Sequence, residues 1–576
     1  MATRPRSVGR TFTAPWRAEP ARIIPNSTLF FGSQIGGKSV INYSYTDMPW
    51  KLLAFDVYYF FTFAWAIPFI LLPITPSDSG ELDELSFTHQ NIFCIAIHFI
   101  LCVLQLAFLL SLPFAVLFPL WTVALGIALF TLVNYGLCTF LNGKETEYHS
   151  DPQYAPELPE HDHEQWIFIN GVAVGQHWMK NNLNRLALTF KRPVLGIHNK
   201  TNGIFLDIVE CLVQRSLGYA TSDVRVCYSI IKEKLYNPKY SKVIFILHSQ
   251  GGIEGSLILD WLLQELPQDL LCKLEVYTFG NAANHFNNPH RYVGAQAQAM
   301  RNPALASVDA SHTADGNGHA SSRPPTPTSP PPEGSDGDNS AAAAAGPAPA
   351  PVRDQPSHFA LRSETSSTNP ASVSYRAIGH IEHYAHTTDF VALWGVLHFA
   401  TSARGSPILP RFIGRVFART SARGGHQLCQ HYLDGMFPLA RDPATGLPAR
   451  DERAGGYVGC ADGEGENEFM ESEVVVGAEG SELDMAREAM ELSWLGTGPD
   501  VEVEVEVEVE VHAGGGSPVE PRGRYRSRAC RGKPPGAKMK VKDLSRLWQY
   551  RNGKSPGEKP PLLATDPDGF VRNATM

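Results

Sequence analysis

A serine on a short polar turn is the first residue whose setting predicts chemistry. The segment VIFILHSQGGIEG, residues 243–255, runs from five apolar residues through Ser249 and two glycines into a helical pattern. A strand, a tight turn and a helix in this order can hold a serine hydroxyl exposed on a strained bend. That hydroxyl is a poor nucleophile at neutral pH. It therefore needs an imidazole to accept its proton, a carboxylate to orient the imidazole, and hydrogen-bond donors for the oxyanion that forms.

The turn is similar to the nucleophile elbow of α/β-hydrolase lipases, whose usual form would be GHSQGG. The position two before the serine is Leu247 in this chain, where those lipases have glycine. A side chain at that position must either displace the following helix slightly or point into the core. The alternative interpretation is an ordinary serine after a buried strand.

The resemblance implies an acid and a base downstream, in the chain order Ser, Asp, His. Asp389, in HTTDFVALWG, lies where such hydrolases present the acid and resembles their Asp-x-Val element. Its alternative role is a helix N-cap, and Glu382 is the substitute acid. His426, in a GGH turn before a helix, is the candidate base, and His431, five residues on, is the alternative base.

The oxyanion would be bound by backbone N–H groups. The resemblance assigns one donor to Gln250 and others to the turn at Gly171 and Val172, in INGVAVG, where asparagine replaces the histidine of a lipase His-Gly turn. Asn-Gly is otherwise a common turn dipeptide. The nine cysteines lack CxxC pairs and metal-ligand spacing, so we expect no disulfide framework and no zinc site. Serine hydrolysis needs no metal or organic cofactor, and none is predicted.

The elements that must position these residues alternate between strand and helix patterns. Apolar runs rich in β-branched residues alternate with amphipathic segments, which is typical of a parallel sheet covered on both faces. The fold class is therefore α/β, and the resemblance implies a three-layer α/β-hydrolase domain with a mainly parallel sheet, in two parts at 160–299 and 374–437. Predicted strands are 166–170, 193–198, 243–247, 273–280 and 376–386, and predicted helices are 203–217, 223–235 and 253–266.

The segment before this domain has the composition of membrane spans. Residues 52–74 carry one charge, Asp56, and residues 92–141 carry none, whereas about 20 apolar residues suffice to cross a bilayer. Because the N-terminal segment is basic and the loop after the first span is acidic, the N terminus is expected in the cytosol, and three crossings put the domain in the lumen. The predicted parts are an N-terminal cytosolic segment at 1–51 and a transmembrane region at 52–141, with spans at about 52–74, 92–112 and 114–137.

Two further segments have compositions unlike a folded domain. Residues 300–373, rich in Pro, Ala and Ser, bury too little apolar surface to fold and are expected to be a disordered insertion. Residues 438–576 are expected to be a low-complexity tail with one short ordered patch at 541–553. The formal net charge of -9 argues against a nucleic-acid-binding protein, because binding to phosphates needs a basic surface.

As a whole, the three predicted spans, HSQGG and GHxxxxHYL resemble a membrane-anchored, lipase-like serine hydrolase of the kind found in fungi. The resemblance implies a serine ester hydrolase of the EC 3.1.1 class, in which His426 deprotonates Ser249 and Asp389 stabilises the imidazolium. Because a bilayer tether concentrates the domain near lipids, a lipid acyl ester is the expected substrate. The expected location is the endoplasmic reticulum or another endomembrane. The alternative function is a catalytically inactive hydrolase-fold scaffold that works through its disordered segments.

Overall fold

The computed structural model describes most of the chain before residue 290 and several segments after it. The predicted insertion at 300–373 lies outside the described residues, as does most of the predicted tail. The described residues are 27–31, 48–289, 376–401, 412–445, 448–451, 456–461, 467–476 and 539–556.

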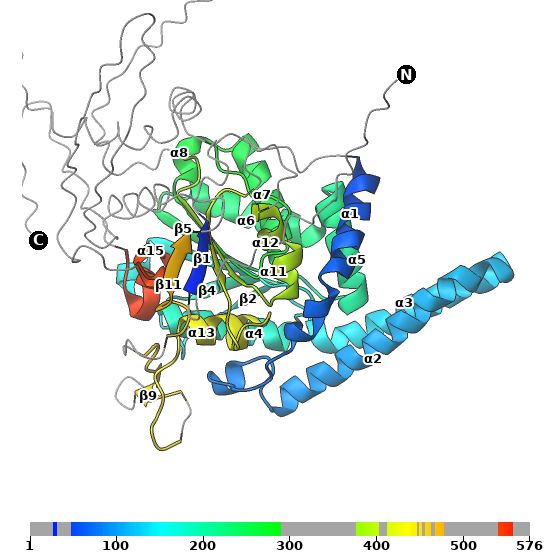
Figure 1. The fold of residues 1–576 in the computed structure, drawn as a ribbon, viewed down its shortest axis with the longest axis horizontal. Helices are drawn as coiled ribbons and strands as arrows, with labels where there is room; N and C mark the ends of the chain where they lie inside the picture. The colour runs from blue at the N-terminus through cyan, green and yellow to red at the C-terminus, as the bar shows by residue number, and fades with distance from the viewer. Residues whose placement is uncertain are drawn as a thin grey trace, which may run out of the picture. The chain divides into compact units, whose positions relative to one another are not determined.

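One mixed, mostly parallel sheet of nine strands organises the described residues, in the order β11-β1-β8-β7-β6-β5-β3-β4-β2 (Figure 1). The six strands from β8 to β4 in this order are parallel, whereas β2 at one edge and β1 next to the other run antiparallel to their inner neighbours. The strands are β1 (Ser27–Phe31), β2 (Glu147–His149), β3 (Glu164–Ile169), β4 (Val194–Ile197), β5 (Lys242–His248), β6 (Leu274–Phe279), β7 (His380–His386), β8 (Arg415–Arg419) and β11 (Glu473–Val476). A separate pair is formed by β9 (Arg450–Asp451) and β10 (Gly456–Tyr457).

Helices cover both faces of this sheet, so the fold is of the three-layer α/β kind that the strand and helix patterns predict. One face packs on α4 and on two segments after β8, and the other packs on α6, α7, α11 and α12. The helices of these layers are α4 (Gln176–Phe190), α5 (Ile204–Leu217), α6 (Ser222–Tyr236), α7 (Gly251–Glu265), α8 (Gln268–Leu271), α11 (Phe390–Trp394), α12 (Val396–Thr401), the π-helix η7 (Leu428–Leu433), α13 (Asp434–Met436), α15 (Val541–Leu544) and the 3-10 helix η8 (Leu547–Gly553).

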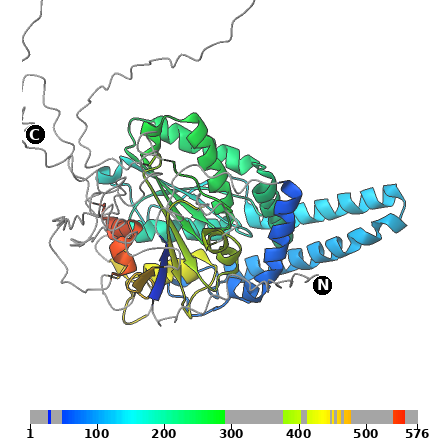
Figure 2. The same cartoon turned by 45° about the horizontal axis from the view of Figure 1, so that its top comes forward.

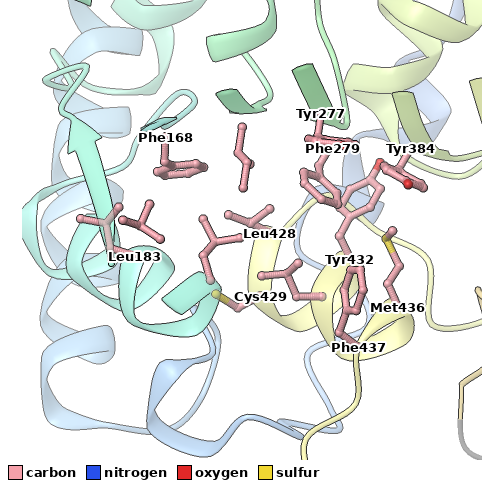
Figure 3. Packing of buried hydrophobic residues seen from close by; sticks show 14 of the residues in the cluster. Phe168, Leu183, Tyr277, Phe279, Tyr384, Leu428, Cys429, Tyr432, Met436 and Phe437 are labelled. Atoms are coloured by element: carbon pink, nitrogen blue, oxygen red, sulfur yellow. The ribbon is translucent and has the colours of Figure 1, made fainter. Parts of the chain in front are cut away.

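The alternation of side chains along the strands builds two separate cores. In β5, Ile244 and Ile246 face the cluster on the α4 side, called the first cluster. Val243, Phe245 and Leu247 face the cluster on the α6 and α7 side, called the second cluster. Successive strand residues point to opposite faces, so a strand that is apolar throughout must be covered on both sides. Figure 3 shows part of the first cluster, in which aromatic rings from the central strands meet the side chains of η7 and α13.

Several segments of the predicted low-complexity tail contribute to this core. Strand β11 pairs with β1, and Phe469 and Met470 just before it are buried. The patch that was expected to be ordered forms α15 and η8, from which Leu547 and Tyr550 enter the first cluster. The second part of the domain therefore extends beyond residue 437, where the sequence pattern placed its end. These added segments are short, and their flanks have no regular pattern, so periodicity alone does not reveal them.

Two helices in the described residues are long and apolar enough to cross a membrane. They are α2 (His89–Ser111), prolonged by the 3-10 helix η4 (Leu112–Leu117), and α3 (Leu120–Asn142), which together account for the second and third predicted spans. Figures 1 and 2 show them running side by side away from the sheet. The first predicted span is not one straight helix. Residues 52–74 instead form α1 (Pro49–Thr62) and the 3-10 helix η2 (Ala64–Ile70), which are bent by 71°.

The first predicted span also packs against the α/β domain. Asp56, the one charge in it, is buried in an ion pair of 2.5 Å with Arg215 of α5. The indole N–H of Trp394 donates to the Asp56 carbonyl over 3.0 Å. A charge in a bilayer is costly unless it is paired, and here the partner comes from the domain. Helix α1 therefore lies along α5 (Figure 1).

Both flanks of this bent pair are attached to the same domain. Before it, β1 pairs with β8 inside the sheet. After it, Ser79 accepts a hydrogen bond of 2.6 Å from Arg185 of α4, and Glu84 accepts one of 3.0 Å from the Cys429 N–H. The segments before and after the bent pair are therefore both part of the α/β domain. Of the three predicted crossings, two are helices long and apolar enough to span a membrane, and the third is this bent pair.

Candidate active site

Ser249 lies on a strained turn at the end of β5. Its φ angle is 58°, a left-handed value that residues other than glycine seldom adopt. The turn is held by the end of β6, because the Ser249 N–H donates to the Phe279 carbonyl over 3.0 Å and the Ser249 carbonyl accepts from the Ala282 N–H over 3.1 Å. Helix α7 begins two residues later. The sequence therefore forms the predicted strand, turn and helix around the serine, which is only 2% exposed.

Leu247 points into the core, and a glycine on the following helix makes room for it. The side chain is fully buried in the second cluster. A Cβ atom added at Gly255 of α7 would lie 2.3 Å from Leu247 Cδ1, well inside normal contact. Helix α7 can therefore cross close to β5 because the small residue is on the helix, whereas in the usual motif it is on the strand.

His426 connects Ser249 to Asp389. Its Nε2 lies 2.9 Å from Ser249 Oγ, and its Nδ1 lies 3.0 Å from Asp389 Oδ2. An ionised carboxylate only accepts, so Nδ1 carries the proton and Nε2 is free to accept from the serine hydroxyl. His426 and Ser249 are 177 residues apart in the chain. The three residues that the sequence singles out are thus brought together in one hydrogen-bonded chain.

Asp389 caps a helix and also contacts His426, so its contacts fit both of the roles that the sequence left open. Its Oδ1 accepts from the Val391 N–H over 2.8 Å and from the Ala392 N–H over 3.3 Å, which caps α11. Its Oδ2 accepts from His426 and from the Tyr432 hydroxyl, the latter over 2.7 Å. Burial acts to raise the pKa of this carboxyl, but the His426, Tyr432 and backbone donors outweigh it and hold the pKa below its ordinary value. Asp389 therefore stays ionised beside the imidazole.

The two alternative residues have other partners. His431 Nδ1 accepts from the Gln427 N–H over 3.0 Å, and its Nε2–H donates to the Pro73 carbonyl over 2.8 Å, so both ring nitrogens are used. Burial lowers its pKa to about 4. Glu382 accepts a hydrogen bond from the Tyr384 hydroxyl over 2.5 Å. The carboxylate that contacts His426 is Asp389 instead.

The predicted oxyanion donors lie beside the serine. A Cβ atom at Gly171 would lie 2.3 Å from Ser249 Cβ, so the turn after β3 approaches the serine as closely as the backbone permits. Within the described residues, the backbone N–H groups of Gln250 and Val172 donate to no other backbone or side-chain atom. Two unused donors near a nucleophile are what an oxyanion requires.

Three further residues complete the arrangement, and sequence reasoning did not assign them to it. Tyr432 is the second donor to Asp389 Oδ2, beside His426. His248 stacks on His426 with ring centroids 4.8 Å apart and donates to the His426 carbonyl over 2.8 Å. Burial and then the neighbouring His426 lower its pKa to about 3, so it stays neutral. Gly280 has φ 53°, and a Cβ there would lie 2.6 Å from Asp389 Oδ2. The one sequence signal that could have pointed to Gly280 is its place as the glycine directly after the apolar run of β6, in TFG.

An apolar segment covers the site. We call α1, η2 and the residues up to Ile74 the covering segment. From it, Tyr59 and Phe63 pack with Val172 of the turn after β3. The Ile70 carbonyl accepts from Gln427, next to the candidate base, over 2.9 Å. Ser249 and His426 beneath this segment are only 2% and 7% exposed.

Comparison with protein-family models, curated proteins and solved structures found no match for this chain. The chemical interpretation therefore depends on the geometry. An imidazole that hydrogen-bonds both a strained serine and a buried carboxylate can take the hydroxyl proton as the oxygen attacks a carbonyl carbon. Acyl transfer through a covalent serine intermediate is the reaction for which these groups are suited.

Proposed function

We propose that this protein is a serine hydrolase of the α/β-hydrolase fold that cleaves acyl esters. The single observation that carries the proposal is the position of His426, within 2.9 Å of Ser249 Oγ and 3.0 Å of Asp389 Oδ2. His426 accepts the serine proton during attack and returns it to the departing alcohol. Water then hydrolyses the acyl-enzyme, with His426 acting as base again. The N–H groups of Gln250 and Val172 bind the oxyanion in both steps.

A lipid is the proposed source of the ester. The covering segment exposes large apolar side chains, among them Trp50, Phe61 and Trp65, each more than half exposed. Two apolar helices, α2 and α3, extend from the same domain. An exposed apolar surface of this kind is stable against lipid. Contact between the bilayer and the covering segment would expose the serine where acyl chains are available.

The proposed location is the cytosolic face of an endomembrane such as the endoplasmic reticulum. The N-terminal segment is rich in arginine, which favours the cytosolic side. Because β1 belongs to the same sheet as the site, the catalytic domain would be cytosolic too, with α2 and α3 as a hairpin that enters and returns. This proposal replaces the lumenal location that charge and three crossings had favoured.

Labelling with a fluorophosphonate probe tests the enzyme proposal. We expect Ser249 to be labelled in detergent-solubilised protein, labelling to be absent in Ser249→Ala, and the labelling rate to fall about 1,000-fold or more in His426→Ala. His431→Ala is the matched control, because that ring bonds Pro73 and not the serine. A folded protein that is never labelled, while a control lipase is, would favour the inactive scaffold.

A further inference from the structure

Three carboxylates lie together near the turn that carries Ser249. Glu210 is on α5, Asp223 is in the first turn of α6, and Glu254 is in the first turn of α7. One oxygen from each carboxylate lies within 4.8 Å of the other two. Glu254 is fully buried, whereas the other two are partly exposed, so the group opens to solvent on one side.

No positive charge of the described residues balances this group. None of the three carboxylates forms an ion pair within the part of the chain that the structure describes. Three neighbouring carboxylates repel each other, and the repulsion is strong where water is excluded. A fold that gathers them needs either protons or a cation at this place.

Glu254 supplies a second observation, independent of the clustering. Its Oε1 accepts from the Asn199 side-chain amide over 2.7 Å, which fixes the direction of the carboxylate. Its Oε2 is buried, and no N–H or hydroxyl group of the described residues donates to it or to Asp223 Oδ2. The carboxyl groups of Glu254 and Asp223 lie within hydrogen-bond reach of each other. A buried carboxylate oxygen without a donor is costly. Either a proton shared by the two carboxyl groups or a bound cation would lower this cost.

We propose that Glu210, Asp223 and Glu254 bind a hard divalent cation, Ca²⁺ or Mg²⁺. Carboxylate oxygens are the ligands that both ions prefer, and softer metals would require histidine or cysteine, which this group lacks. Ca²⁺ takes about 6–8 oxygens and accepts flexible geometry, and Mg²⁺ needs about six in a strict octahedron. Three carboxylates offer enough oxygens for Ca²⁺ if some are bidentate, and water enters from the open side.

The cation would act on the candidate active site through Gln250. The side-chain amide of Gln250, the residue after Ser249, donates to Glu210 over 3.2 Å and to Gln214 over 3.1 Å. The backbone N–H of the same residue is a proposed oxyanion donor. An ion that joins the starts of α6 and α7 to α5 would fix this backbone, so we expect it to rigidify the turn without touching substrate.

Calorimetric titration of the full chain in detergent tests the site directly, whether or not the protein is an enzyme. After treatment with a chelator, CaCl₂ or MgCl₂ is added separately. We expect one ion to bind per chain, with a rise in the thermal unfolding midpoint at saturation. Glu254→Gln should abolish both effects. The variant should fold without the ion, because the substitution keeps the shape and removes one buried charge.

Glu265→Gln is the matched control, since Glu265 is on the same helix but is solvent-exposed and paired with Lys232. It should bind the ion as the unaltered chain does. The inference is overturned if neither salt binds, or if Glu254→Gln binds with unchanged affinity. Binding without any change in fluorophosphonate labelling would leave the site in place and refute its link to the turn. If neither the unaltered chain nor any variant is labelled while the ion still binds, the proposed function is refuted and the cation site is not.

Discussion

Gly255→Val tests why a leucine is tolerated two residues before the candidate nucleophile. A Cβ at this position lies 2.3 Å from Leu247 Cδ1, whereas unstrained carbon atoms stay about 3.5–4.0 Å apart. Overpacking of this kind costs about 1–3 kcal/mol, of which about 0.5 kcal/mol is returned because valine forms helix better than glycine. Leu247→Ala alone should cost about 2–5 kcal/mol through the cavity it leaves.

The double variant provides the decisive measurement. Leu247→Ala removes three carbon atoms and Gly255→Val adds three beside them, so we expect the pair to be more stable than the sum of the single effects by at least about 1 kcal/mol. Urea denaturation followed by tryptophan fluorescence gives the free energies of unfolding. Gly435→Val is the control, because a Cβ at Gly435 meets no atom within 4 Å. If the changes in the free energy of unfolding add to within about 0.5 kcal/mol, Gly255 is not the residue that makes room for Leu247.

Three further outcomes are expected. Tyr432→Phe removes a donor from Asp389, so kcat/KM should fall about 10-fold to 100-fold, as the loss of a charge-assisted hydrogen bond implies. The pKa of the carboxyl should rise because one of its donors is lost, and a folded variant with unchanged kcat/KM would contradict the role of Tyr432. Asp56→Asn leaves Arg215 buried without its charged partner and should lower stability by about 3 kcal/mol in thermal unfolding. Burial, Asp223 and Asp207 raise the pKa of Glu210 to about 7, so the folded protein holds a proton that the unfolded chain releases above about pH 4.5. Stability in chelator should therefore fall as pH rises from about 4.5 to 7, and saturating Ca²⁺ should flatten this fall; a slope unaffected by Ca²⁺ would contradict cation binding at Glu210.

The sequence predicted the central part of the fold and site because both have local signals. The β-branched runs predicted β3 to β6 to within two residues at each end. Ser249 was found from a strand, a turn and two glycines in one short stretch, and Asp389 from its place after β7. The choice between His426 and His431 was beyond local pattern. It depends on Pro73, more than 350 positions away, whose carbonyl accepts from the His431 ring. The His426 ring is left to bond Ser249.

The parts that sequence reasoning missed depend on long-range pairing. Residues 52–74 are apolar enough for a span, and hydropathy does not show that Asp56 meets Arg215, 159 residues later. Strand β1 is five residues long and becomes recognisable only through its partners β8 and β11. Tyr432 looks like any core aromatic until Asp389 lies 2.7 Å from it. Short elements and buried polar partners are therefore the features that a single sequence conceals.

The sheet has a consequence for the order of events during synthesis. Strand β1 leaves the ribosome early, but its neighbours are β8, residues 415–419, and β11, residues 473–476. The apolar hairpin of α2 and α3 is complete hundreds of residues before either neighbour exists. On the proposed membrane location, the nascent chain enters the bilayer while β1 is still unpaired. Ser249, His426 and Asp389 then converge only afterwards, on a chain already tethered.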